Sequence, residues 1–83
     1  MTKEQKLPAD PDGKNDERAD AANKSIRFFM TNTGTDRDDA LCDLLCNLRH
    51  WADREPADFE AQLERANDHY LAETAQPGPL SDF

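Results

Sequence analysis

Hydrophobic positions recur at helical spacing in three segments of the chain. The first segment spans about residues 16–31, and its apolar residues follow one another at three- and four-residue steps: Ala19, Ala22, Ile26 and Phe29. This spacing forms one apolar stripe along an α-helix. Asn32 or Gly34 can then take the left-handed conformation that ends many helices. The pattern predicts a helix over about 16–31.

The second segment, about residues 36–52, has the strongest periodic pattern. One helical face carries Leu41, Leu44, Leu45, Leu48 and Ala52, with Trp51 beside it. Thr35 is the expected N-cap residue. The acidic residues that follow it suit the positive end of the helix dipole: Asp36, Asp38 and Asp39.

The third segment, about residues 56–73, begins with Pro56, a residue that is favoured at the first position of a helix. Its apolar stripe consists of Phe59, Leu63, Ala66 and Tyr70. A connection as short as the one before Pro56 makes consecutive helices antiparallel neighbours. We expect a helical hairpin in which Leu44, Leu48 and Trp51 face Phe59, Leu63 and Tyr70. The preceding helix would cross this hairpin or dock against a second copy.

The residue types support an all-α protein with one domain at about residues 16–74. Valine is missing and isoleucine occurs once, so no run of strand-forming residues exists. Residues 1–15 contain Pro8, Pro11 and Gly13 and little apolar surface, which predicts a disordered segment. Pro77 and Pro79 end the helical region and predict a flexible tail over 75–83.

The apolar inventory is small for a domain of this size. About a dozen large apolar side chains serve about 55 ordered residues, and a domain of that size is marginally stable without a metal, a disulfide or a second chain. We therefore expect a homodimer, or stabilisation by another protein.

The chain of 83 residues carries 18 acidic and 10 basic side chains, for a net charge of −8. Residues 1–34 are neutral overall, so the whole excess lies in residues 35–83. Nucleic acids and anionic membranes repel such a charge, which argues against both as partners. No apolar run exceeds three residues, so neither a signal peptide nor a membrane span is predicted, and a cytoplasmic location is expected.

The acidic residues of the two hairpin helices are the candidate protein-binding residues. Glu60, Glu64 and Asp68 follow one another at four-residue steps and form one stripe. Two interpretations remain open: a solvated helix face, or a surface that meets a basic protein. A second acidic face is formed by Asp36, Asp39 and Asp43. Capping explains these three better than a magnesium site does.

Cys42, Cys46 and His50 also share one helical strip. They could supply three zinc ligands, with His69 as a distant fourth, or a redox site. Ligands in zinc modules more often come from loops, so the simpler interpretation is that both cysteines pack against the first helix or a dimer mate. We assign no metal and no cofactor. Free thiols fit a reducing cytoplasm.

Catalytic patterns are missing from the sequence. The three glycines are scattered at turns, and neither Ser25 nor Ser81 has an identifiable histidine and aspartate nearby in the sequence. We therefore do not expect an enzyme. Three helices also suit a helix-turn-helix protein, but the third helix presents acids where a recognition helix needs donors to the bases.

The stretch from Ile26 to Glu73 resembles small acidic proteins encoded on bacterial plasmids, phages and integrated elements. The residues that carry the resemblance are 33–36 (TGTD), 39–46 (DALCDLLC), 50–53 (HWAD), 58–59 (DF) and 69–70 (HY). No activity is established for that group, so the resemblance implies a bacterial cytoplasmic setting and an accessory role, and no site residues. Inhibitors of restriction or CRISPR systems share this size and charge.

The main hypothesis is therefore a non-enzymatic accessory protein that binds another, basic protein through its acidic helix faces. One alternative is a small dimeric regulator that touches DNA through its N-terminal arm. Another is a thiol or zinc protein that uses Cys42, Cys46 and His50.

Overall fold

The computed structural model describes residues 7–75 and places three α-helices in them, α1 (Lys14–Thr33), α2 (Arg37–Arg54) and α3 (Phe59–Glu73). The described part of the chain contains no strand. The all-α class, the number of helices and their order are thus as predicted. Helix α1 is two residues longer at each end than the expected 16–31. The remaining residues of the two predicted tails, 1–6 and 76–83, lie outside the described residues.

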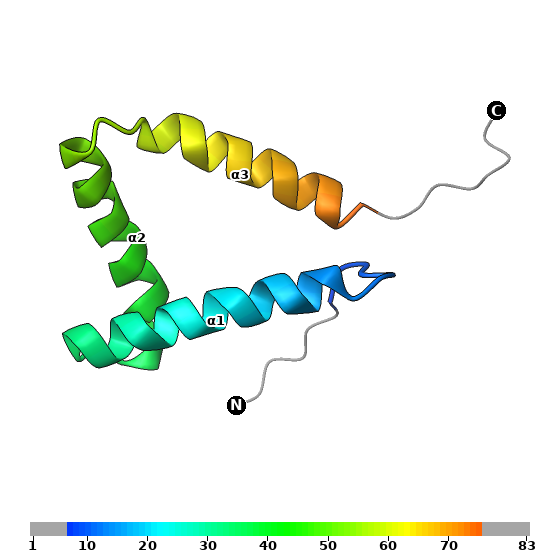
Figure 1. Ribbon diagram of the computed structural model, residues 1–83, viewed down its shortest axis with the longest axis horizontal. Coiled ribbons are helices and arrows are strands. Elements are labelled where there is room, and N and C mark those ends of the chain that lie inside the picture. The colour runs from blue at the N-terminus through cyan, green and yellow to red at the C-terminus, as the bar shows by residue number, and fades with distance from the viewer. Residues whose placement is uncertain (1–6, 76–83) are drawn as a thin grey trace, which may run out of the picture.

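The three helices form the sides of an open triangle (Figure 1). Helix α2 joins α1 at one corner and α3 at the next, while the start of α1 lies near the end of α3. The shortest dimension of the chain is 20 Å. A helix with its side chains is about 10–12 Å wide, so this dimension is slightly less than two helix diameters.

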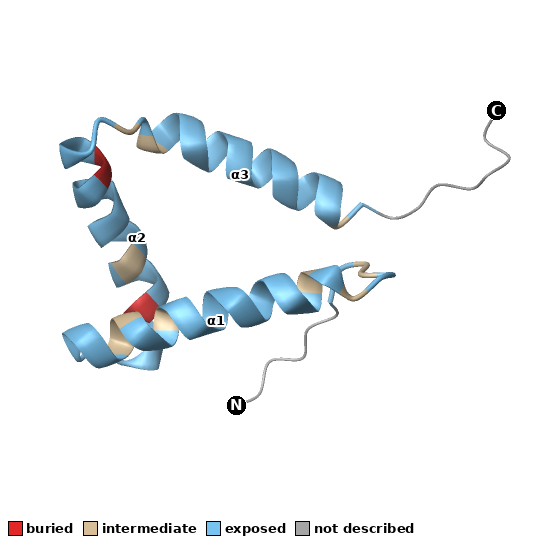
Figure 2. Ribbon diagram, in the orientation of Figure 1, coloured by how far each residue is buried: buried red, intermediate tan, exposed pale blue. Residues whose placement is uncertain are grey.

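Very little of this triangle is buried (Figure 2). Within residues 7–75 the buried positions are Ala40 and Ala52, which lie near opposite ends of α2. The hairpin of α2 and α3 is present but open, because the two helices diverge from their short connection. Of the leucine and aromatic residues that were expected to face each other, Leu44 and Phe59 are half-buried. The other four remain largely exposed, from 41% at Leu48 to 57% at Trp51.

The turn between α1 and α2 follows the predicted glycine cap. Gly34 has φ 78°, and its N–H donates to the Met30 carbonyl at 2.8 Å. The N-cap residue of α2 is Asp36, not the expected Thr35. The Asp36 carboxylate accepts from the Asp39 N–H at 3.1 Å, whereas the Thr35 hydroxyl donates to Asp43 at 3.4 Å. Helix α2 begins at Arg37 because the Asp36 carboxylate, and not the Thr35 hydroxyl, accepts a free N–H of its first turn.

The connection between α2 and α3 differs from the prediction in the place of Pro56. Helix α3 begins at Phe59, and Pro56 lies in the preceding turn. The Ala57 N–H closes this turn on the Ala52 carbonyl at 3.1 Å. The Asp58 side chain then caps α3 by accepting from the Ala61 N–H at 3.0 Å. The cap at Asp58, rather than the proline, fixes where α3 starts.

The cap of α2 leads to a stability prediction. Asp36→Ala removes the side chain that satisfies the Asp39 N–H, so we expect a loss of about 1 kcal/mol in the free energy of unfolding. Asp38→Ala is the matched control, because it removes a first-turn acid that makes no cap hydrogen bond. Urea titrations followed by circular dichroism measure both losses. Equal losses in the two variants would contradict the capping role of Asp36.

Candidate protein-binding surfaces

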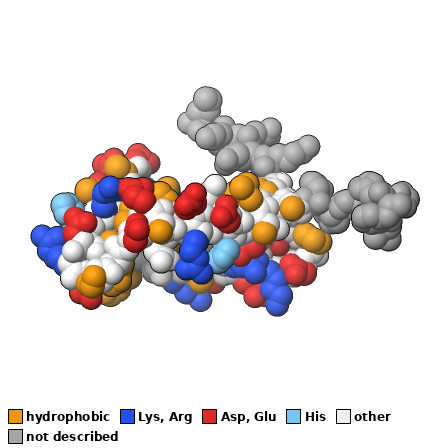
Figure 3. All heavy atoms as spheres, turned by 90° about the horizontal axis from the view of Figure 1, so that it is seen from above, with side chains coloured by type: hydrophobic (Ala, Val, Ile, Leu, Met, Phe, Trp, Pro, Cys, Tyr) orange, Lys and Arg blue, Asp and Glu red, His pale blue; other side chains and the backbone are white. Residues whose placement is uncertain are grey.

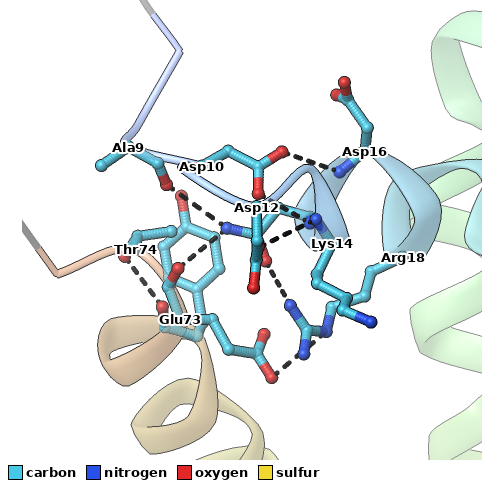
Figure 4. Close-up of polar contacts among 10 residues, drawn as sticks. Ala9, Asp10, Asp12, Lys14, Asp16, Arg18, Glu73 and Thr74 are labelled. Atoms are coloured by element: carbon cyan, nitrogen blue, oxygen red, sulfur yellow. Dashed lines mark hydrogen bonds and ion pairs between the residues drawn. The ribbon is translucent and has the colours of Figure 1, made fainter.

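The start of α1 is tied to the end of α3 by polar contacts (Figure 4). The Asp10 carboxylate accepts from the Asn15 and Asp16 N–H groups at 2.9 and 3.1 Å. The Asn15 amide donates to the Glu73 carbonyl at 2.8 Å, and Arg18 pairs with the Glu73 carboxylate at 3.5 Å. Residues 10–15, which the sequence placed in a disordered segment, therefore form the capped start of α1 and the third corner of the triangle.

A pocket of about 340 Å³ lies at this corner, between the start of α1 and the end of α3. Leu7, Ala19 and Tyr70 contribute apolar walls, and Arg18 and Glu73 contribute charges that are already paired with each other. Sequence reasoning missed this pocket, since no local pattern links residues that are 58 positions apart. The Arg18 and Glu73 charges in its lining neutralise each other, and the Asp10 carboxylate is engaged by the Asn15 and Asp16 N–H groups.

The acidic stripe of α3 is exposed along its length, but its members differ in their partners. Glu60 forms an ion pair with Arg49 of α2. The Arg49 guanidinium carbon also lies 5.4 Å from the centre of the Phe59 ring, a cation–π distance. Both charged side chains are more than half exposed, so the pair contributes little stability. Its main effect is to neutralise Glu60, the stripe member nearest the turn.

Glu64 and Asp68 have no such partner in the part of the chain that the structure describes. Arg65, which was expected to relieve Asp68, donates instead to the Gln62 side chain at 3.4 Å. A shallow depression lies beside Glu64, where Leu63 is 49% exposed. Seen from the α3 side, acidic, basic and hydrophobic side chains are interspersed on the surface (Figure 3). The free negative charge of α3 thus borders exposed apolar surface.

The three acids at the start of α2 lie close enough to influence one another. Asp36 caps the helix, Asp43 accepts from Thr35, and Asp39 lies between them. The charge of Asp36 is the main cause of a raised pKa at Asp39, followed by desolvation and by the charges of Asp43 and Asp38. The capping hydrogen bond supports the interpretation of this cluster as a helix start.

Cys42 and Cys46 are both free thiols, and both are exposed, as is His50. The cysteines therefore do not pack against α1 as expected, because the apolar arc of α2, and not the cysteine strip, faces the other helices. Their contact with a dimer mate remains a prediction. His69 is exposed on α3. Within residues 7–75, no three side chains of histidine, cysteine, aspartate or glutamate gather in an arrangement that could hold a metal ion.

Comparison of the chain with protein families, curated proteins and solved structures finds no match. No helix within residues 7–75 has both the length and the apolar character needed to cross a membrane. The candidate surfaces are therefore interpreted from their own chemistry.

The acidic cluster of α2 gives a pH-dependent prediction. A raised pKa means that the folded chain binds a proton at Asp39 more tightly than the unfolded chain, so stability from this group rises as the pH falls through that pKa. At pH 7 the charged Asp39 carboxylate destabilises the folded state, mainly through repulsion by Asp36. We therefore expect Asp39→Asn to raise the thermal midpoint at pH 7, and this gain to shrink as the pH falls through the raised pKa of the Asp39 carboxyl toward its ordinary value of 3.8.

Thermal melts of both proteins across this pH range, followed by circular dichroism, measure the difference. Glu64→Gln is the control, because it also removes one negative charge but lies on α3, away from the acidic cluster of α2. A gain that is absent at pH 7, or that grows in acid, contradicts the interaction.

Proposed function

We propose that this chain is a non-enzymatic accessory protein of a bacterial mobile element, and that it binds a basic protein in the cytoplasm through the acidic face of α3. The observation that carries the proposal is the charge distribution. The full excess of −8 lies in residues 35–83, and Glu64 and Asp68 hold unpaired charges on α3 within the described residues.

The geometry of the acidic face suits a cationic partner. Glu60, Glu64 and Asp68 follow each other with a rise of about 6 Å per step along α3. Lysine or arginine side chains spaced by one helical turn would meet them in register. Charges arranged in this way accelerate association and select among partners more than they add affinity.

The apolar surface beside the acids supports protein rather than small-molecule recognition. Leu63 lies in the depression between Glu60 and Glu64 and is half exposed. Protein interfaces typically combine such an apolar centre with a polar rim. The depression is shallow and offers no enclosed volume in which a substrate could be held.

The setting of the proposal comes from the resemblance of residues 26–73 to small acidic proteins of plasmids, phages and integrated elements. Accessory proteins of that kind act on host machinery, and many nucleic-acid-binding proteins of the host carry basic surfaces. An acidic chain that covers such a surface would inhibit or modulate the host protein that carries it.

The prediction is that neutralising the free acids of α3 weakens partner binding by on the order of tenfold. The test is affinity capture of bacterial proteins on the wild-type chain, identification of the captured proteins, and titration of each purified partner against the Glu64→Gln/Asp68→Asn variant at several salt concentrations. Affinity for the wild-type chain should fall as the salt concentration rises.

The matched control is Asp16→Asn/Glu17→Gln, which removes an equal number of negative charges, two, from α1. This variant should retain wild-type affinity. Binding that is independent of salt, capture of neutral or acidic proteins alone, or equal losses in the two double variants would each refute the acidic face as the binding surface.

A further inference from the structure

The apolar residues of α2 face the inside of the triangle. At 100° per residue, they occupy an arc of about 140° that has Ala40 at its edge and Ala52 within it. These two alanines are buried at the corners where α2 meets its neighbouring helices. The arc between them therefore faces inward, and it carries Leu41, Leu44, Leu45, Leu48 and Trp51.

The stripes of α1 and α3 also face inward. Asn15 and Glu73 contact each other across the third corner and so mark the inner side of both helices. Asn15 shares its side of α1 with the stripe residues Ala19, Ala22 and Ile26. Tyr70 lines the corner pocket and shares its side of α3 with Phe59 and Leu63. Three apolar stripes thus face one central region.

This central region lacks a core. Six large side chains on the inward arcs of α2 and α3 are between 41% and 63% exposed: Leu41, Leu45, Leu48, Trp51, Leu63 and Tyr70. At about 200 Å² for each side chain, they leave on the order of 600 Å² of apolar surface uncovered. That is the upper end of what a monomer exposes in one patch. It also equals most of the roughly 800 Å² that each partner contributes to a standard interface.

Whatever covers this apolar surface must be bound whenever the chain is folded. Helices of 15 to 20 residues are marginal in isolation, and within residues 7–75 the buried core is two alanines. A second copy of the chain meets this requirement, since it is made together with the first.

The charges of α1 and α3 do not oppose this occupant. Glu60 and Glu73 of α3 are already paired with Arg49 and Arg18 within one chain. Two copies related by a two-fold axis can place α1 of each copy near α3 of the other, and a closed dimer repeats the contact twice. Glu64 and Asp68 lie about 100° or more from the Leu63 stripe and remain outside such an interface.

We propose that the inward apolar faces of α2 and α3 pack against the same faces of a second copy, and that the folded protein is a two-fold symmetric homodimer. Leu45, Leu48, Trp51 and Tyr70 form the shared core. This proposal concerns assembly and does not depend on the acidic binding surface, so either can fail without the other.

The test uses the full chain and its single tryptophan. Sedimentation equilibrium should give 18.8 kDa, which is twice the 9.4 kDa of one chain. The thermal midpoint should rise with protein concentration, as mass action requires. Acrylamide should quench Trp51 weakly in the dimer, and more strongly on dilution, because the side chain is 57% exposed in one chain alone. A helical protein with the mass of one chain, or of more than two, overturns the proposal.

A variant pair locates the interface. Leu48→Glu places a charge in the proposed core and should give a monomer or an unfolded chain at concentrations where the wild type is dimeric. Phe28→Glu is the matched control, since Phe28 is 72% exposed and lies about 200° around α1 from Ile26. This control should remain dimeric. A Leu48→Glu dimer with wild-type affinity, or equal disruption by Phe28→Glu, overturns the assignment of the interface.

Discussion

An amphipathic helix is stable in water only when its apolar stripe is covered, and this requirement governs the whole molecule. Each of the three helices within residues 7–75 has an apolar stripe and a capping interaction at one end or both, so each is well specified locally. Caps fix where α2 and α3 begin, through Asp36 and Asp58, and Gly34 fixes where α1 ends. None of these interactions covers a leucine. The tertiary arrangement therefore depends on what occupies the inner side of the triangle, where two alanines are the buried residues of the described chain.

The elements could be predicted from sequence because they are local. The three-and-four spacing of apolar residues, the left-handed cap at Gly34 and the acids in the first turn of α2 all act within a few residues. Boundaries were less accurate where two capping signals compete. Pro56 and Thr35 both satisfy general preferences, yet Asp58 and Asp36 provide the carboxylates that accept the free N–H groups.

The contacts between helices could not be predicted in this way. The link between Asn15 and Glu73 joins residues 58 positions apart, and the pair between Arg49 and Glu60 depends on the angle at which α3 leaves the turn. The α3 stripe was identified correctly as exposed and acidic. Because Glu60 forms an ion pair with Arg49, the unpaired negative charges of the stripe are those of Glu64 and Asp68. The cysteines do not pack against α1, because the leucine arc occupies the inward side of α2, and their contact with a dimer mate stays a prediction.

The corner at which Asn15 and Arg18 meet Glu73 has a topological consequence. It brings the first and last turns of the helical region side by side, although they are the most distant in sequence. The ends of this region could thus be joined by a short linker and new termini opened at Glu55, in the connection between α2 and α3. Such a circular permutant keeps every helix intact. The order in which the helices are connected is therefore separable from the triangle that they build.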